Sequence, residues 1–275
     1  MGEKAIGRPL ESVISRSYKL GDRDVHDMEV DAIIPARMGS TRYPGKPLCD
    51  IQGKTMVEHV YRRTELSDRV DATYVATPDE EIKQEVESFG GDAIMTGSHT
   101  RPVSRVAEAA KSTDGDIVVV VQGDEPLVYP DMIDDATEPL LNDDEIGCVN
   151  LAKKIEDEEV FRDPNTVKLT VDLDWNALFF SREPIPNLRD VSFDEFDVYK
   201  QVCIMPFRRD FLLNYVELEE TPLVLAESID MLRLLEHGYN VKIVETYKDV
   251  HAVDTKEDHE KVEKKMAEDD LFGDY

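Results

Sequence analysis

The segment from Pro35 to Leu48 combines glycine, hydroxyl and basic residues directly after the first apolar run of the chain. Glycines allow a close approach of the backbone to a ligand. The residues of this segment that could bind one are Gly39, Gly45, Ser40, Thr41, Arg37, Arg42 and Lys46. Backbone donors combined with positive charge suit a triphosphate. The sequence therefore predicts a triphosphate-binding loop, with a solvated basic loop as the alternative. It is not a Walker A loop, because Pro47 follows Gly45-Lys46.

Two acidic positions could hold a metal ion. Asp124 lies in Gln122-Gly123-Asp124-Glu125-Pro126, which follows a run of four valines. A carboxylate at the carboxyl end of a central strand is well placed to hold Mg²⁺, which prefers one or two carboxylates together with substrate phosphates. Asp254 precedes a charged helical segment. Each carboxylate could instead cap the segment that follows it, and both could bind one ion only if the fold brings them together.

Apolar runs alternate with amphipathic segments from residue 30 onward. This alternation predicts βαβ units and an α/β domain with a mostly parallel sheet in three layers. Expected strands cover 30–34, 73–76, 93–95, 116–121, 167–172, 178–180, 202–205 and 241–244. Expected helices cover 55–66, 80–88, 103–111, 225–236 and 255–266. Residues 1–28 form an expected N-terminal extension, and 29–275 an expected single domain with an inserted sub-layer around 165–235.

Composition limits the possible functions. The formal net charge is −28, from 60 acidic and 32 basic residues. This excess argues against a nucleic-acid-binding surface. No apolar run approaches the roughly 20 residues that cross a bilayer, and no secretory signal pattern is present, so we expect a cytoplasmic protein. Cys49, Cys148 and Cys203 match neither a disulfide framework nor a zinc motif.

These segments together resemble the 3-deoxy-manno-octulosonate (Kdo) cytidylyltransferases. The similarity extends from Val30 to the terminal helix. Further matching segments are Gly90-Gly91, Met95-Thr96, Asp163-Pro164-Asn165-Thr166-Val167-Lys168, Phe180-Ser181-Arg182 and Ile185-Pro186. The resemblance implies a nucleotide-diphospho-sugar transferase fold, which is Rossmann-like, and a homodimer. It also implies an enzyme that couples CTP to a small acidic acceptor and releases pyrophosphate.

The resemblance assigns roles to individual residues. Arg37, Lys46 and Asp124 would be the catalytic residues, and Asp124 and Asp254 would bind Mg²⁺. The nucleotide would contact Pro35, Ala36, Arg37, Gly39, Ser40, Thr41, Lys46, Thr96, Arg105 and Gln122. The acceptor would contact Gln122, Arg182, Gln201 and Glu227.

The chain departs from the family pattern in three segments. The His-x-Ser-Gly-Thr run near the nucleobase is one residue shorter here and lacks its Gly-Thr, in residues 95–105. On the acceptor side, Gln201 replaces a histidine, residues 201–207 lack two tyrosines, and Val224 replaces a glutamate. We therefore keep open a phosphonate or an ulosonic acid other than Kdo as acceptor, another nucleoside triphosphate as donor, and a nucleotide-binding sensor without catalytic activity.

Overall fold

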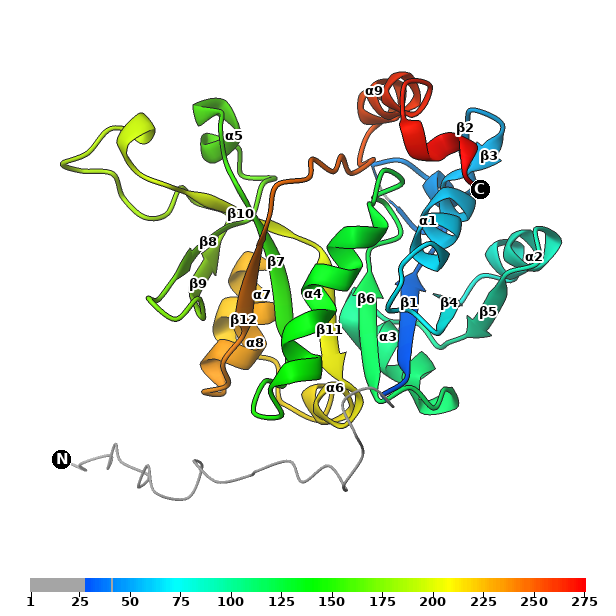
Figure 1. The fold of residues 1–275 in the computed structure, drawn as a ribbon, viewed down its shortest axis with the longest axis horizontal. Helices are drawn as coiled ribbons and strands as arrows, with labels where there is room; N and C mark the ends of the chain where they lie inside the picture. The colour runs from blue at the N-terminus through cyan, green and yellow to red at the C-terminus, as the bar shows by residue number, and fades with distance from the viewer. Residues whose placement is uncertain (1–27, 41) are drawn as a thin grey trace, which may run out of the picture.

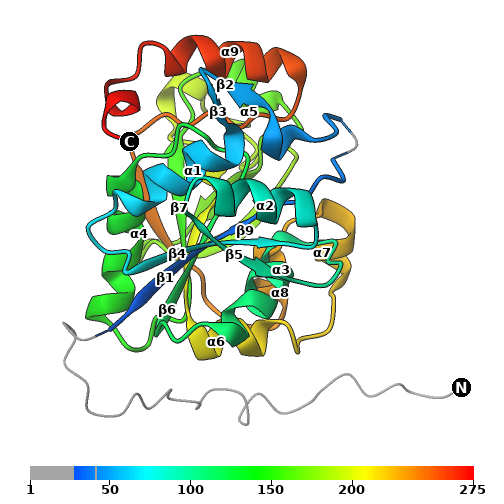
Figure 2. The ribbon, with the colours of Figure 1, turned by 90° about the vertical axis from the view of Figure 1, so that its right-hand side faces the viewer.

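A computed structural model of the protein describes residues 28–40 and 42–275. Its first sheet has the strand order β11-β6-β1-β4-β5 (Figures 1 and 2). The parallel strands are β1 (Val30–Pro35), β4 (Ala72–Thr77), β5 (Asp92–Met95) and β6 (Ile117–Val121), and β11 (Ile204–Arg208) pairs antiparallel with β6. This sheet confirms the predicted α/β class with a mostly parallel sheet.

Helices cover both faces of the first sheet and complete three layers. Side chains alternate along β6, so that Val119 and Val121 pack with the helices of one face and Val118 and Val120 with those of the other. The first face carries α1 (Met56–Glu65), α2 (Glu80–Ser88) and α4 (Pro130–Asn142). The second carries α3 (Pro102–Ala109) and α6 (Arg209–Tyr215). Because β6 is buried on both faces, a continuous valine run suits it.

A second sheet has the order β12-β7-β10-β8-β9. Its strands are β7 (Val149–Lys154), β8 (Lys168–Val171), β9 (Ala177–Ser181), β10 (Tyr199–Val202) and β12 (Lys242–Thr246). Only β12 and β7 pair in parallel; the other pairs are antiparallel. Its strands β8, β9 and β10 lie within the range 165–235 expected for a sub-layer, and β7 and β12 lie outside that range.

Smaller elements complete the fold. They are β2 (Asp50–Ile51), β3 (Lys54–Thr55), α5 (Glu158–Arg162), α7 (Pro222–Glu227), α8 (Met231–Glu236) and α9 (Lys256–Met266). One apolar core includes residues from both sheets together with α7 and α8. No helix in the described ranges is long and apolar enough to span a lipid bilayer.

Two predicted elements are each divided in the structure. The strand expected at 202–205 spans the end of β10 and the start of β11, because the chain passes from the second sheet to the first at Cys203. The helix expected at 225–236 is interrupted between α7 and α8, where Ser228 adopts the left-handed conformation with φ of 56°. The predictions missed α4, β7, α5 and α6. The three cysteines are free thiols, as predicted.

Candidate active site

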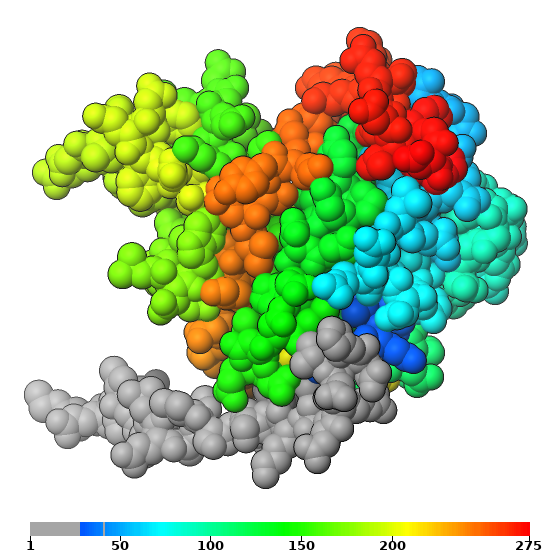
Figure 3. Space-filling model, in the orientation of Figure 1, coloured from blue at the N-terminus to red at the C-terminus, as the bar shows by residue number. Residues whose placement is uncertain are grey.

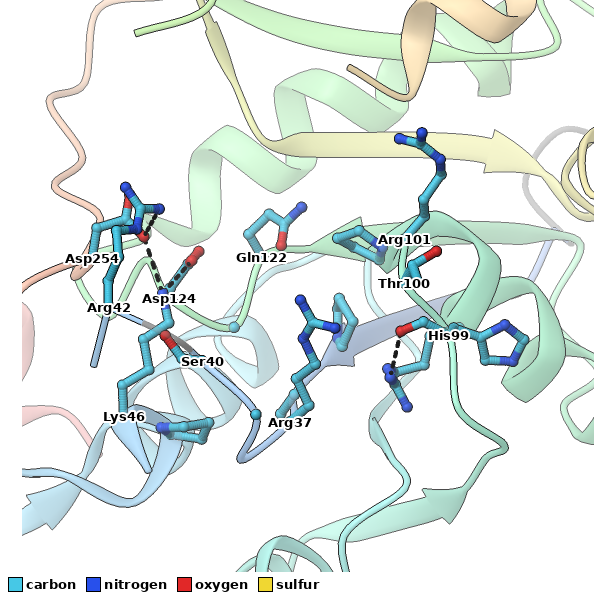
Figure 4. A pocket seen from close by; sticks show the side chains of 17 residues that line it. Arg37, Ser40, Arg42, Lys46, His99, Thr100, Arg101, Gln122, Asp124 and Asp254 are labelled. Atoms are coloured by element: carbon cyan, nitrogen blue, oxygen red, sulfur yellow. Dashed lines mark hydrogen bonds and ion pairs between the residues drawn. The ribbon is translucent and has the colours of Figure 1, made fainter. Parts of the chain in front are cut away.

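A pocket of about 280 Å³ lies at the carboxyl ends of β1 and β6 (Figure 4). Ligands of open α/β sheets usually bind at this edge. The lining residues are Pro35, Ala36, Arg37, Gly39, Ser40, Arg42, Lys46, Pro47, His99, Thr100, Arg101, Pro102, Arg105, Gln122, Gly123, Asp124 and Asp254. The pocket thus brings together most of the predicted nucleotide and metal residues. Thr96, Arg182, Gln201 and Glu227 are not in its lining, and Thr41 is outside the described residues.

The loop after β1 presents unpaired donors to this pocket. The backbone N–H of Met38 donates to Asp79 Oδ2 at 2.8 Å, and that of Gly45, with φ of 74°, donates to Met38 O at 3.3 Å. Among the described residues, the N–H groups of Arg37 and Gly39 find no hydrogen-bond partner, and the exposed Arg37 side chain forms no ion pair. Figure 4 shows the Arg37 side chain between the loops that bound the pocket. These donors are available to an anionic ligand.

The loop after β6 approaches β1 closely at Gly123. A Cβ atom on this residue would lie 2.7 Å from the carbonyl oxygen of Pro35 and 3.3 Å from Ile34 Cγ2. Only glycine therefore fits here without a shift of the backbone. The close approach places Asp124 beside the loop that carries Lys46.

Lys46 joins the two predicted metal carboxylates. Its Nζ lies 2.8 Å from Asp124 Oδ2, 3.2 Å from Asp254 Oδ1 and 2.9 Å from the carbonyl oxygen of Val253. The backbone holds the same arrangement, because the N–H of Val253 donates to Asp124 O at 2.8 Å. Arg42 adds a second cation, with Nη2 at 2.9 Å from Asp254 Oδ1. Asp124 and Asp254 are thus brought together as the metal prediction requires.

These two carboxylates fit Mg²⁺ bound together with a nucleotide. Within the described residues, no group of three or more His, Cys, Asp and Glu side chains could enclose a metal ion. Mg²⁺ usually takes one or two protein carboxylates and completes its shell with phosphate oxygens and water. The Lys46 ammonium now bridges both carboxylates, which shows that this position favours a cation.

The neighbouring Glu125 is buried and only partly satisfied. The residue is 8% exposed and its Oε2 atom has no hydrogen-bond partner. Burial, together with the negative charge of Asp124, raises the pKa of the Glu125 carboxyl to about 8. An uncharged acid therefore lies beside Asp124 at neutral pH, where a second full negative charge would be repelled.

Glu125 should make stability depend on pH. In the unfolded chain the Glu125 carboxyl has a pKa of 4.5, so it loses its proton at a lower pH than in the folded protein. The stabilisation that Glu125 contributes is therefore fully present below pH 4.5 and decreases as the pH rises to about 8. Glu125→Gln removes the titrating group, so its unfolding free energy should decrease less steeply with pH over this range than that of the wild type. The difference in slope is expected to be up to about 1.4 kcal/mol per pH unit. Urea denaturation from pH 5 to 8 measures the unfolding free energy of both proteins. Parallel slopes for wild type and variant would contradict the assignment.

The segment after β5 is fixed by Arg105 from α3. Nη1 of Arg105 donates to Thr96 Oγ1 at 2.8 Å and to Gly97 O at 3.2 Å, and Nη2 donates to His99 O at 3.2 Å. His99 pairs with Glu108 of the same helix as Arg105. Burial and the nearby Arg37 lower the pKa of Arg105. Arg105 and Thr96 thus hold this segment in shape, and the Thr96 hydroxyl reaches Arg105 rather than the pocket.

Three predicted acceptor residues, Arg182, Gln201 and Glu227, lie outside the pocket, whereas Gln122 lines it. Ser181 Oγ donates to Glu227 Oε1 at 2.9 Å, and the Arg182 backbone N–H donates to Glu227 Oε2 at 2.9 Å. Nε of Arg182 donates to the carbonyl oxygen of Glu227 at 2.8 Å. Gln201 Nε2 donates to Asn150 Oδ1 at 2.6 Å. Arg182 and Glu227 are therefore brought together, whereas Gln201 contacts neither of them by a hydrogen bond.

Two contributions to the site were not predicted from the sequence. Arg101, to which the sequence analysis assigned no role, forms ion pairs with Glu220 and Asp230. Glu125 was noted as part of its segment, without a role. The sequence contained a signal for Glu125, because this residue directly follows an aspartate at the end of a strand. It contained no signal for the ion pairs of Arg101, because their acidic partners are more than 100 residues away.

Comparisons with known proteins agree with this geometry. The cytidylyltransferase family model matches residues 32–261. The chain is 44% identical over 250 residues to the 3-deoxy-manno-octulosonate cytidylyltransferase of Geobacter metallireducens, covering 87% of this chain and 98% of that protein. It is 46% identical over 245 residues to the enzyme of the same name from Geotalea uraniireducens, covering 86% and 98%.

A solved structure is similar over the same range. It is a CMP:2-keto-3-deoxy-manno-octonic acid synthetase in complex with CTP, with a TM-score of 0.82, 38% identity, and coverage of 87% of this chain and 99% of that chain. A cytidylyltransferase from Leptospira borgpetersenii, 19% identical with a TM-score of 0.60, shares the fold. Because of these matches, together with the geometry of the pocket, the chain belongs to the cytidylyltransferase family of nucleotidyltransferases.

Proposed function

We propose that this protein transfers the cytidylyl group of CTP to a hydroxyl of a 3-deoxy ulosonic acid of the Kdo class, releasing pyrophosphate. One observation supports this proposal most directly. The unpaired N–H groups of the loop after β1 lie at the same pocket as Lys46, Asp124 and Asp254. The relatives named for Kdo and the similar structure bound to CTP support both substrates.

The reaction is an in-line attack of the acceptor hydroxyl on the α-phosphorus. The N–H groups of Arg37 and Gly39 and the Arg37 guanidinium would bind the phosphates and hold them in line. Lys46 would exchange a carboxylate for a phosphate oxygen and so stabilise the charge that grows on the departing pyrophosphate. Gln122, at the end of β6, would contact the ribose or the acceptor. Catalysis then depends on positioning and electrostatics, without a covalent enzyme intermediate.

We further propose that Asp124 and Asp254 hold Mg²⁺ together with the nucleotide. When bound, Mg²⁺ would supply positive charge at the phosphate oxygens. The support is the donor set itself, two carboxylates that already share one cation.

The acceptor's carboxylate is assigned to Arg182. Arg182→Ala is expected to raise the KM for the acceptor by about 10- to 100-fold, because a charge-assisted hydrogen bond is lost. The KM for CTP should stay within about twofold. Steady-state pyrophosphate release, varying each substrate in turn, measures both. Arg69→Ala, which removes an exposed ion pair with Glu138, is the matched control. An unchanged KM for the acceptor would refute the contact.

A homodimer completes the proposal. The segment 183–197, between β9 and β10, projects from the body of the protein (Figures 1 and 3). Val191 and Phe196 are exposed on it, as are Leu178 on β9 and Leu173 in the turn between β8 and β9. Apolar exposure of this kind is typical of a subunit interface. Light scattering should give twice the chain mass of 31.3 kDa; a monomer at micromolar concentration would contradict the proposed dimer.

The proposed use of CTP supports a cytoplasmic location for the protein.

Product analysis tests the proposed reaction. The protein is incubated with CTP, Mg²⁺ and, separately, Kdo, a second ulosonic acid and a phosphonate, and the CMP conjugate is identified by mass spectrometry. We expect a conjugate with an ulosonic acid. A conjugate with the phosphonate alone would replace the acceptor class, and nucleotide binding without any conjugate would favour the sensor.

A further inference from the structure

Arg101 connects the nucleotide pocket to the region of α7 and α8, which carries the acceptor residue Glu227. It is the residue before α3 and lines the pocket, but its guanidinium points toward α7 and α8. Nε lies 2.7 Å from Glu220 Oε1, Nη1 lies 3.2 Å from Asp230 Oδ1, and Nη2 lies 3.4 Å from the carbonyl oxygen of Val224. All three partners belong to the α7–α8 region, whereas Arg101 belongs to the segment after β5.

The ion pair between Arg101 and Asp230 is the more buried of the two. The side chains of Arg101 and Asp230 are 14% and 13% exposed. Arg101 is the only ion-pair partner of Asp230 among the described residues. Removal of one member of a buried pair leaves an uncompensated charge, which costs more than the loss of an exposed pair.

The three residues that Arg101 contacts lie before, within and after α7. The last residue of α7 is Glu227. Glu227 accepts hydrogen bonds from Ser181 Oγ and the Arg182 N–H, and its carbonyl oxygen accepts from Arg182 Nε. α7 has only six residues, and a helix this short depends on tertiary contacts for its stability. A displacement of α7 would therefore move the carbonyl oxygen that holds Nε of Arg182, whose Nη1 donates to the carbonyl oxygen of Pro164 at 3.3 Å.

We infer that Arg101 is a positioning residue for the acceptor, acting through α7 and Glu227 on Arg182. Its role differs from that of Arg105, which lies four residues later and holds residues 96–99 on the nucleotide side. The inference rests on the proposed function only in that Arg182 binds the acceptor.

Steady-state kinetics of Arg101→Ala test the inference. We expect the KM for Kdo to rise about tenfold while the KM for CTP changes less than about twofold. Arg101→Lys, which keeps the pair with Asp230, should restore part of the loss. Arg69→Ala, which removes an exposed pair with Glu138, is the matched control. Equal changes in both KM values would overturn the inference.

A double variant separates action through Arg182 from direct contact with the acceptor. If Arg101 acts through Arg182, Arg101→Ala should add little to the KM of Arg182→Ala. Additive effects on the KM for Kdo would overturn the inference.

Hydrogen exchange provides a test that needs no turnover. Arg101→Ala should accelerate amide exchange in 222–227, with little change in α2, and unchanged exchange in 222–227 would overturn the inference. If Arg101→Ala fails to fold, Glu220→Gln, which removes the more exposed partner, should give the same pattern with smaller changes. Failure of the wild-type protein to form any CMP conjugate would reject the proposed function and leave this exchange test valid.

Discussion

Asp124→Asn should keep the fold and reduce kcat by at least about 100-fold, because a preorganised charge at a reacting phosphate contributes several kcal/mol to transition-state stabilisation. The substitution preserves shape and leaves an oxygen that can still accept from Lys46. It removes one of the two negative charges that would bind Mg²⁺. Pyrophosphate release at saturating CTP and acceptor measures the loss, and far-ultraviolet circular dichroism checks the fold.

The matched control is Glu145→Gln, which removes one negative charge from an exposed loop outside the pocket. It should retain full activity and the same dependence on Mg²⁺. If Asp124→Asn retained near-normal turnover, Asp124 would have no part in the mechanism.

Lys46→Met should have two opposite effects. The loss of the cation near the leaving pyrophosphate is expected to lower kcat by about 100- to 1000-fold. The same change removes the ammonium that bridges Asp124 and Asp254. Mg²⁺ should then bind these carboxylates several-fold more tightly, because its competitor for them is gone.

Steady-state turnover and the Mg²⁺ dependence of thermal stability measure the two effects separately. Lys83→Met, which removes an exposed helical ion pair with Glu87, is the control for loss of a surface lysine. Weaker Mg²⁺ binding in Lys46→Met would contradict the proposed competition between the ammonium and the metal ion.

The first half of the fold follows from the sequence because its signals are local. The strand β6 is a continuous β-branched run and β1 is apolar except for Asp31, and each is followed by a polar segment. Strand ends of a parallel sheet meet at one edge, so the junction of the Pro35–Leu48 segment with Asp124 could be predicted.

The second half depends on contacts that no local pattern records. The end of β10 and the start of β11 form one apolar run over 202–205, yet the chain changes sheets at Cys203. Ser228 divides what reads as one helix, although serine does not favour the left-handed conformation that it adopts. The neighbourhood of Asp124 and Asp254 is set by the backbone hydrogen bond from Val253 to Asp124, between segments far apart in the chain. Sequence spacing alone could not establish that proximity, and family resemblance supplied it.

Pyrophosphate release with each of the four ribonucleoside triphosphates, in the presence of Mg²⁺ and Kdo, tests the proposed transfer most directly. We predict release that requires both CTP and Kdo and that is lost on chelation of the metal. Release with another nucleotide in place of CTP, or equal release without Kdo, would contradict cytidylyl transfer to this acceptor.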